Sequence, residues 1–317
     1  MSHLVESMAY VGQVPWHGLG NQLSRQQPLS VWLKEAGMDW SIKQSDVMFN
    51  AAEEGLFLRS HDSAQVLYRS DTLAPLSVVS NRYKVVQPEE VLHFYKDLVQ
   101  AGGFELETAG VLKGGRKLWA LAKTGQAAKL KGNDQLKAYL LLATSCDGTL
   151  CTTAQFTSVR VVCNNTLQVA VGQKAGAVKV PHSTVFDPKQ VKEALGLGLS
   201  SWDTFMRDLK AMSQRPISPE EAYRFFAEVL DDPCATQADL PPSKPMQQLL
   251  SLYDGTGMGA ELASSKNTAW GLVNAMTEFV DHHRRARNQD YRLDSAWFGH
   301  GAQLKHKAYS QAMALLH

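Results

Sequence analysis

The 317-residue chain is poor in cysteine and has no long apolar run. Its four cysteines, Cys146, Cys151, Cys163 and Cys234, are too few and too irregularly spaced for a disulfide framework or a zinc site. No apolar stretch reaches the roughly 18 residues that a membrane helix needs, and the first residues lack the basic and apolar regions of a signal peptide. These absences predict a reduced, cytoplasmic protein without a membrane partner.

The chain as a whole also lacks an excess of positive or negative charge. Its 32 basic and 31 acidic residues leave a formal net charge of +1, which excludes a uniformly basic nucleic-acid binder. The balance is uneven along the chain, because the segment 111–145 contains seven basic residues and one acid, Asp134. A second basic concentration lies between His282 and Arg292. Both segments are candidates for contact with a polyanion.

Motifs for familiar catalytic chemistry are absent. The sequence contains no phosphate-binding loop, dinucleotide fingerprint or hydrolase nucleophile elbow. Cys163 with His182 is a candidate thiol pair, but the apolar neighbours of Cys163 favour a buried, inert thiol. Asp281, His282 and His283 are candidate metal ligands, but adjacent histidines on a helix point about 100° apart, which favours a basic helix end. We therefore favour a protein without catalytic residues, metal or cofactor.

The first half of the chain predicts an α+β fold, in which an antiparallel β-meander has flanking helices. Pro88, followed by two glutamates, begins a helix that ends at residue 101. Lys113–Arg116 is typical of a hairpin turn. Gly55–Arg59 and Gln65–Arg69 predict a hairpin that closes near His61–Asp62. The other predicted strands are 40–49, 76–86, 104–112, 117–123, 136–144 and 149–156.

From Asp187 onward, apolar residues recur at helical spacing, which predicts a mainly helical C-terminal region. Ser218, Pro219 and Glu221 form a strong helix start with a capping box. Three prolines between Ala235 and Pro245 indicate a linker. The expected organisation is an α+β domain over residues 1–186 and a helical region over residues 187–317.

The segment 158–171 is ambiguous between helix and strand. Its apolar positions fit one helix face, whereas the β-branched run from Val159 to Val162 is typical of a strand, and the spacing slightly favours the helix. The segment also holds Arg160 and a polar cluster, Cys163–Asn164–Asn165–Thr166. This cluster either fixes the sheet-to-helix junction around a buried guanidinium or presents donors to a phosphate or base edge. We favour the structural role.

Cations in the predicted meander suggest a groove for single-stranded nucleic acid. They recur in and beside successive strands, where they could follow a phosphate backbone while nearby aromatic rings stack with bases. The alternative is that these lysines keep a sheet edge soluble. Arg284 and Arg285 form a second candidate site, for which an exposed helix end is the alternative. The candidates in and after the meander are Lys113, Arg116, Lys117, Trp119, Lys123, Tyr139 and Arg160.

Five separated motifs, in order, resemble those of the phage/plasmid-like protein family, the group of the domain of unknown function 932. This family occurs on prophages, plasmids and integrative elements and has no settled activity. The resemblance therefore implies a mobile-element protein without naming a reaction. The motifs are Pro15–Gly20, Asn81–Gln87, Asp147–Gly148, Arg160–Leu167 and Trp297–Gly299.

The order of helix, basic meander and further helix is also similar to the core of ring-forming single-strand annealing proteins. This similarity implies a homo-oligomer that binds single-stranded DNA and promotes annealing in DNA recombination, or protects the strand. Two alternatives remain. One is an enzyme directed at nucleic acid, with Cys163 or the Asp281–His283 group at its centre. The other is an interaction protein that counters host defence or regulates the element.

Overall fold

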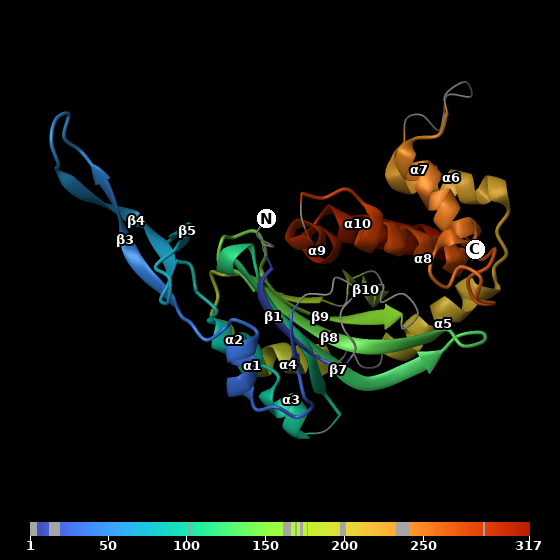
Figure 1. Ribbon diagram of the computed structural model, residues 1–317, viewed down its shortest axis with the longest axis horizontal. Helices are drawn as coiled ribbons and strands as arrows, with labels where there is room; N and C mark the ends of the chain where they lie inside the picture. The colour runs from blue at the N-terminus through green and yellow to red at the C-terminus, as the bar shows by residue number, and fades with distance from the viewer. Residues whose placement is uncertain are drawn as a thin grey trace. The chain divides into compact units, whose positions relative to one another are not determined.

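The computed structural model describes residues 5–12, 20–101, 103–160, 166–168, 170–171, 174–175, 177–196, 201–232, 241–287 and 289–317 (Figure 1). The chain divides into two compact units, neither of which is one continuous segment. The first unit comprises residues 1–124, 140–155 and 177–196, and the second comprises residues 125–139, 156–176 and 197–317. The fold is α+β, with antiparallel sheets and a mainly helical C-terminal region.

The larger sheet has the strand order β10-β9-β8-β7-β6-β1-β2, and β13 also pairs with β9. β1 runs antiparallel to β6 and parallel to β2. Strands β7, β8 and β9 each contribute residues to both units. The strands are β1 (Val5–Val11), β2 (Asn21–Leu23), β6 (Glu105–Leu112), β7 (Lys117–Lys129), β8 (Gln135–Ser145), β9 (Thr152–Arg160), β10 (Thr166–Gln168) and β13 (Ala177–Val180). A separate short pair consists of β11 (Ala170–Val171) and β12 (Lys174–Ala175).

The predicted meander is confirmed. β6 and β7 form an antiparallel hairpin in which Leu112 lies opposite Lys117, and a short 3-10 turn, η1 (Lys113–Gly115), connects them. The helix predicted before the meander is instead two short helices, α2 (Pro88–His93) and α3 (Lys96–Ala101). α2 begins at Pro88, as predicted, and Gln87 and Glu90 form a capping box at its start.

The helix predicted over residues 158–171 is wrong wherever the structure describes this segment. β9 extends through Arg160, and β10 returns antiparallel to it with Thr166 opposite Val159. β-branched side chains lose χ1 freedom in a helix but pack well beside a neighbouring strand, so this preference outweighs the helical spacing. Residues 161–165, which include Cys163, Asn164 and Asn165, lie outside the described residues.

A second sheet forms a three-stranded antiparallel arm, defined here as residues 42–80 (Figure 1). Its strands are β3 (Ile42–Asn50), β4 (Leu58–Arg69) and β5 (Pro75–Ser80). β4 is one continuous strand of 12 residues, so the hairpin predicted to close near His61–Asp62 is wrong. These two polar residues are exposed on the arm, where a polar pair is compatible with a strand. The turn between β3 and β4 lies at residues 51–57 instead.

The base of the arm is anchored to the start of α2. Gln87, the residue before α2, accepts a hydrogen bond from the Ile42 amide (2.8 Å) and donates one to the Ile42 carbonyl (3.1 Å). Arg69 lies opposite Ile42 in the sheet, and its guanidinium carbon lies 4.3 Å from the centroid of the Trp40 ring. The same guanidinium donates two hydrogen bonds to the Asp71 carboxylate. These contacts fix the arm at its base.

The first unit also contains α1 (Leu29–Glu35) and α4 (Pro188–Gly196). Tyr95, between α2 and α3, is fully buried, and its hydroxyl lies 2.8 Å from the Ala120 carbonyl oxygen and 3.0 Å from that of Leu140. Phe94 packs edge-to-face against Tyr95. Trp119 of β7 belongs to the same unit and is 2% exposed. The centre of the meander is therefore core.

The helix start predicted at Ser218 is confirmed in the second unit. Ser218 and Glu221 form the expected capping box, with each side chain accepting a hydrogen bond from the backbone amide of the other. No helix in the described part of the chain is long and apolar enough to cross a membrane. The helices are α5 (Ser201–Gln214), α6 (Pro219–Leu230), α7 (Lys244–Ser251), α8 (Ala269–Glu278), α9 (Gln289–Phe298) and α10 (His300–Ala314), with π-helical turns η3 (Leu252–Thr256) and η4 (Phe279–His283).

Buried charges in the second unit are paired. The Asp134 carboxylate, in the turn between β7 and β8, accepts hydrogen bonds from the Ser264 hydroxyl (2.7 Å) and the Trp270 indole (3.0 Å). Lys305 of α10 donates to Asp281 over 2.8 Å, and these two side chains are only 4% and 3% exposed. Buried charged groups need such partners, because an isolated one loses its hydration without compensation.

Candidate nucleic-acid interface

Four loops that are distant in sequence meet in the first unit, and we call them the loop cluster: residues 81–84, 113–116, 146–151 and 181–184. The Lys84 amide donates a hydrogen bond to the His182 carbonyl (2.6 Å), and the Cys146 amide donates to the Arg116 carbonyl (2.9 Å). The Tyr83 hydroxyl donates to the carbonyl of Ser145, immediately before the third loop (2.7 Å). Two backbone hydrogen bonds and the Tyr83 side chain therefore connect the four loops.

An aromatic pair lies within the loop cluster. The Tyr83 and His182 rings are stacked, with centroids 4.4 Å apart and planes 18° from parallel. Nε2 of His182 lies 2.9 Å from the Leu150 carbonyl oxygen. Burial, with smaller contributions from Cys146 and Asp147, raises the pKa of Tyr83, so its phenol is a neutral donor at physiological pH. The pair fixes the backbone on which Arg82 and Lys84 are carried.

Three cations of the loop cluster, Arg82, Lys84 and Arg116, are exposed, and Lys113 is half-buried. The loop that carries Lys113 and Arg116 is a tight turn, in which three successive residues, Lys113, Gly114 and Gly115, have φ values of +55°, +69° and +98°. A Cβ on Gly115 would lie 3.0 Å from the Trp40 ring, so only glycine allows this close approach. Glycine at position 115 therefore allows the turn to pack against Trp40.

Asp147 is the acid of the loop cluster. Burial alone would raise the pKa of this carboxyl, but hydrogen bonds from the Thr149 side chain and amide, with the charge of Lys117, hold it below its ordinary value. The Thr149 hydroxyl donates over 2.6 Å and its amide over 3.0 Å. Lys117 is only 4% exposed. The Lys117 charge therefore stabilises the Asp147 carboxylate and is not accessible to an external ligand.

The two described cysteines differ in exposure. Burial, to which the neighbouring Asp147 adds, raises the pKa of Cys146 to about 12, so its thiol is protonated and inert at neutral pH. Cys151 is exposed. Neither forms a thiol–histidine pair in the structure, and Cys163, the candidate nucleophile, lies outside the described residues.

The structure places the predicted nucleic-acid residues in different environments. Lys113 and Arg116 are in the loop cluster, whereas Lys123 forms an ion pair with Glu107 over 3.2 Å. Trp119 and Tyr139 are 2% and 4% exposed, so neither ring offers an open face for stacking with a base. They are apolar strand residues that complete the core, which a sequence without burial information cannot distinguish from exposed platforms.

The remaining predicted residues lie in the second unit. Arg160 is the last residue of β9 and Thr166 the first of β10. Arg284 is half-buried and donates to the Ser295 hydroxyl (3.1 Å), and burial lowers the pKa of its guanidinium. Arg285 is exposed. Arg284 therefore holds the local fold, whereas the side chain of Arg285 faces solvent.

The Asp281–His283 group does not form a metal centre. The Asp281 carboxylate is bonded to Lys305, and Nε2 of His283 lies 3.7 Å from Glu278. Across the described ranges, no group of three histidine, cysteine, aspartate or glutamate side chains is arranged to hold a metal ion.

Sequence reasoning missed three residues of the loop cluster. Arg82 and Lys84 lie outside the basic segment 111–145, and the sequence suggests His182 only as a partner for Cys163. The available signal was the motif Asn81–Gln87, which contains both cations. Its place beside the Lys113–Arg116 turn depends on contacts between residues that are far apart in the sequence.

The fold and the loop cluster together define an α+β protein with a basic loop surface. The chain belongs to the family described as "Domain of unknown function (DUF932)", whose model matches residues 75–297. The match includes all four loops of the cluster, whereas β3 and β4 precede it. No curated protein and no solved structure matches the chain.

Proposed function

We propose that the protein binds single-stranded DNA through the loop cluster, as a cytoplasmic homo-oligomer that promotes annealing or protects the strand for a phage or plasmid. One observation carries this proposal: hydrogen bonds of the backbone and of the Tyr83 and His182 side chains bring together the loops that carry Arg82, Lys84, Lys113 and Arg116. The acid of the cluster, Asp147, is matched by the buried Lys117. Arg82, Lys84 and Arg116 are exposed beside it, and Lys113 is half-buried in the same loop as Arg116.

Phosphate contacts rather than base contacts would dominate this binding. The aromatic residues of the meander are buried, so lysine and arginine side chains supply the affinity. Contacts of this kind are tolerant of sequence and release counterions from the strand. Affinity should therefore fall as salt rises, with a slope of about −0.7 in log–log form for each phosphate neutralised, or about −3 for four contacts.

The test is fluorescence anisotropy of a labelled oligonucleotide over a series of salt concentrations. Replacing Arg82 and Lys84 together by Ala should make the slope shallower by about 1.4, and so should replacing Lys113 and Arg116. The matched control is Lys129→Ala with Lys131→Ala, which removes the same charge from exposed positions of the second unit and should leave the slope nearly unchanged.

Absence of binding at low salt would refute the proposal, and an unchanged slope in both loop variants would remove the loop cluster from it. Annealing is then measured separately, by fluorescence transfer between complementary labelled strands. Degradation of the oligonucleotide in the same assay would favour the alternative of an enzyme directed at nucleic acid.

A further inference from the structure

The tip of the arm is apolar, although turns are ordinarily rich in glycine, proline, asparagine, aspartate and serine. Large apolar side chains gather where β3 and β4 meet, and each is between 48% and 78% exposed. Glu53 and Glu54, in the turn itself, are also exposed. Contiguous exposed apolar surface of this kind marks an interaction site. The apolar residues of the tip are Met48, Phe49, Leu56, Phe57 and Leu58.

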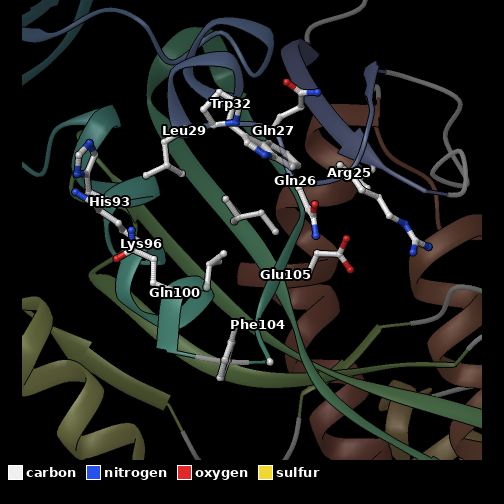
Figure 2. Close-up of a pocket in the computed structure, with 15 residues that line it drawn as sticks. Arg25, Gln26, Gln27, Leu29, Trp32, His93, Lys96, Gln100, Phe104 and Glu105 are labelled. Carbon is white, nitrogen blue, oxygen red and sulfur yellow. The ribbon is translucent and has the colours of Figure 1, made fainter.

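A cavity of about 780 Å³ in the first unit has the complementary character (Figure 2). Its interior is apolar, since Trp32 and Leu106 are buried and Leu29 and Phe104 are half-buried. In Figure 2, Leu29 and Trp32 come from α1, His93 from α2, and Lys96 and Gln100 from α3. This volume lies within the range of about 300–1,000 Å³ typical of binding pockets.

The rim of the cavity is basic. Arg25 and Lys96 are exposed at its edge, and His93 is bonded to Glu89 over 3.0 Å. Glu105 supplies one acid near Arg25 in Figure 2. An apolar interior with two exposed cations matches a tip that has five apolar side chains and two exposed carboxylates.

The tip cannot reach the cavity of its own chain. The arm is anchored at Ile42 through Gln87, which precedes the helix that carries His93 of the rim. The nine residues of β3 then extend the chain by roughly 27 Å before the turn, because a strand rises about 3.3 Å per residue. Figure 1 shows β3 and β4 leading away from α1 and α2. An arm tip that fills this cavity must therefore belong to another molecule.

We propose that the arm tip of one chain inserts into this cavity of a second copy of the chain. Leu56, Phe57 and Leu58 enter the apolar interior, while Glu53 and Glu54 face Arg25 and Lys96. Because the two surfaces differ, the contact is heterologous, and its repetition produces a ring or an open filament. This inference rests on the homo-oligomer in the proposed function, but oligomeric mass is measured in the absence of DNA.

The test is the mass of the full chain by light scattering or sedimentation over a range of concentrations. The tip variant, Leu56→Ser with Phe57→Ser, and the rim variant, Arg25→Glu with Lys96→Glu, should each weaken association by about tenfold or more. All four positions are exposed, so these chains should fold, and circular dichroism checks this. The matched control is Val78→Ser, since Val78 is 61% exposed on the same arm but away from the tip.

Mixing separates this contact from a symmetric one. A tip variant retains its cavity and a rim variant retains its tip, so an equimolar mixture should form 1:1 complexes that do not grow further. A chain that carries Glu53→Lys, Glu54→Lys, Arg25→Glu and Lys96→Glu exchanges the charges and should regain association that either half alone lacks.

Three results would overturn the inference. A wild-type chain that stays monomeric at every concentration has no such contact. Oligomers that survive both the tip and rim variants use another surface. A rim variant that loses oligonucleotide binding but keeps its oligomeric mass identifies the cavity as a nucleic-acid site instead. Loss of oligonucleotide binding by the loop variants alone would leave the arm contact untouched, so the two proposals fail separately.

Discussion

The buried ion pair of Lys305 and Asp281 in the second unit and the cations of the loop cluster in the first differ in their exposure. In the second unit, Lys305 and Asp281 are almost completely buried and bonded to each other. In the loop cluster of the first unit, Arg82, Lys84 and Arg116 face solvent. A buried ion pair has lost its hydration and depends on its partner, whereas an exposed cation retains its water and can exchange it for a phosphate.

This difference assigns separate roles to the same residue types. A buried charge of the second unit should affect stability and leave oligonucleotide binding unchanged, while an exposed cation of the loop cluster should do the reverse. The contrast also explains why the net charge is a poor guide to binding in this protein. The formal value of +1 counts buried ion pairs together with exposed cations.

The largest effect on stability is expected for Lys305→Met, which keeps much of the side-chain volume and removes the charge. It leaves the Asp281 carboxylate buried without its partner, so we expect the free energy of unfolding to fall by about 3–5 kcal/mol. Urea denaturation measures this loss. The double variant with Asp281→Leu should recover part of it, because no buried charge then remains.

Lys307→Met is the matched control two positions further along α10. Lys307 pairs with Asp231 over 2.7 Å, but the Asp231 side chain is 84% exposed. An exposed pair contributes at most about 1 kcal/mol, so the same substitution should change stability little. Equal losses at the two positions would contradict the assignment of the buried pair to stability.

A smaller effect is expected for Tyr83→Phe in the loop cluster. The variant keeps the stack with His182 but removes the hydrogen bond to the Ser145 carbonyl, which should lower the free energy of unfolding by about 1 kcal/mol. The salt slope of oligonucleotide binding should not change, since no cation is lost. Tyr68→Phe is the control, because Tyr68 is also half-buried and its hydroxyl makes no hydrogen bond to any described residue. A changed slope in Tyr83→Phe would show that Tyr83 contacts the strand itself.

Local signals predicted much of the fold. The capping box at Ser218, the proline at the start of α2 and the glycines after Lys113 each act within a few residues, so their outcomes are readable from sequence. The errors arose where two local signals compete. Residues 158–160 satisfy both a helical spacing and a β-branched preference, and pairing with β10 decides between them.

The candidate site was harder to predict for a different physical reason. Lys113, Arg116, Lys117 and Lys123 look equivalent in sequence, yet Lys117 is buried and acts on the charge of Asp147, and Lys123 forms an ion pair with Glu107. The exposure of each cation depends on acids that folding brings near it. The contribution of Arg82 and Lys84 depends likewise on the hydrogen bond between Lys84 and His182, 98 residues apart.

The smallest effect is expected from Asp147→Asn. This acid lies in the loop cluster and should affect both stability and oligonucleotide binding. Its pKa in the folded protein lies below the ordinary value of 3.8, so its ionised form stabilises the fold above that pH and this stabilisation is lost as pH falls through the folded-state pKa. Because the group is only partly buried, solvent screening limits the contribution to less than about 1 kcal/mol.

The wild-type chain should therefore be slightly more stable than Asp147→Asn at pH 7, and urea midpoints of the two should converge below pH 3.8. Thr149→Val removes the 2.6 Å hydrogen bond to this carboxylate and should reproduce part of the difference at pH 7. Neutralising Asp147 also removes the negative charge beside the open cations, so oligonucleotide affinity should rise by less than about tenfold at low salt. Weaker binding by Asp147→Asn would mean that this acid orders the loop for the strand, and that stability and binding are not separated in the loop cluster.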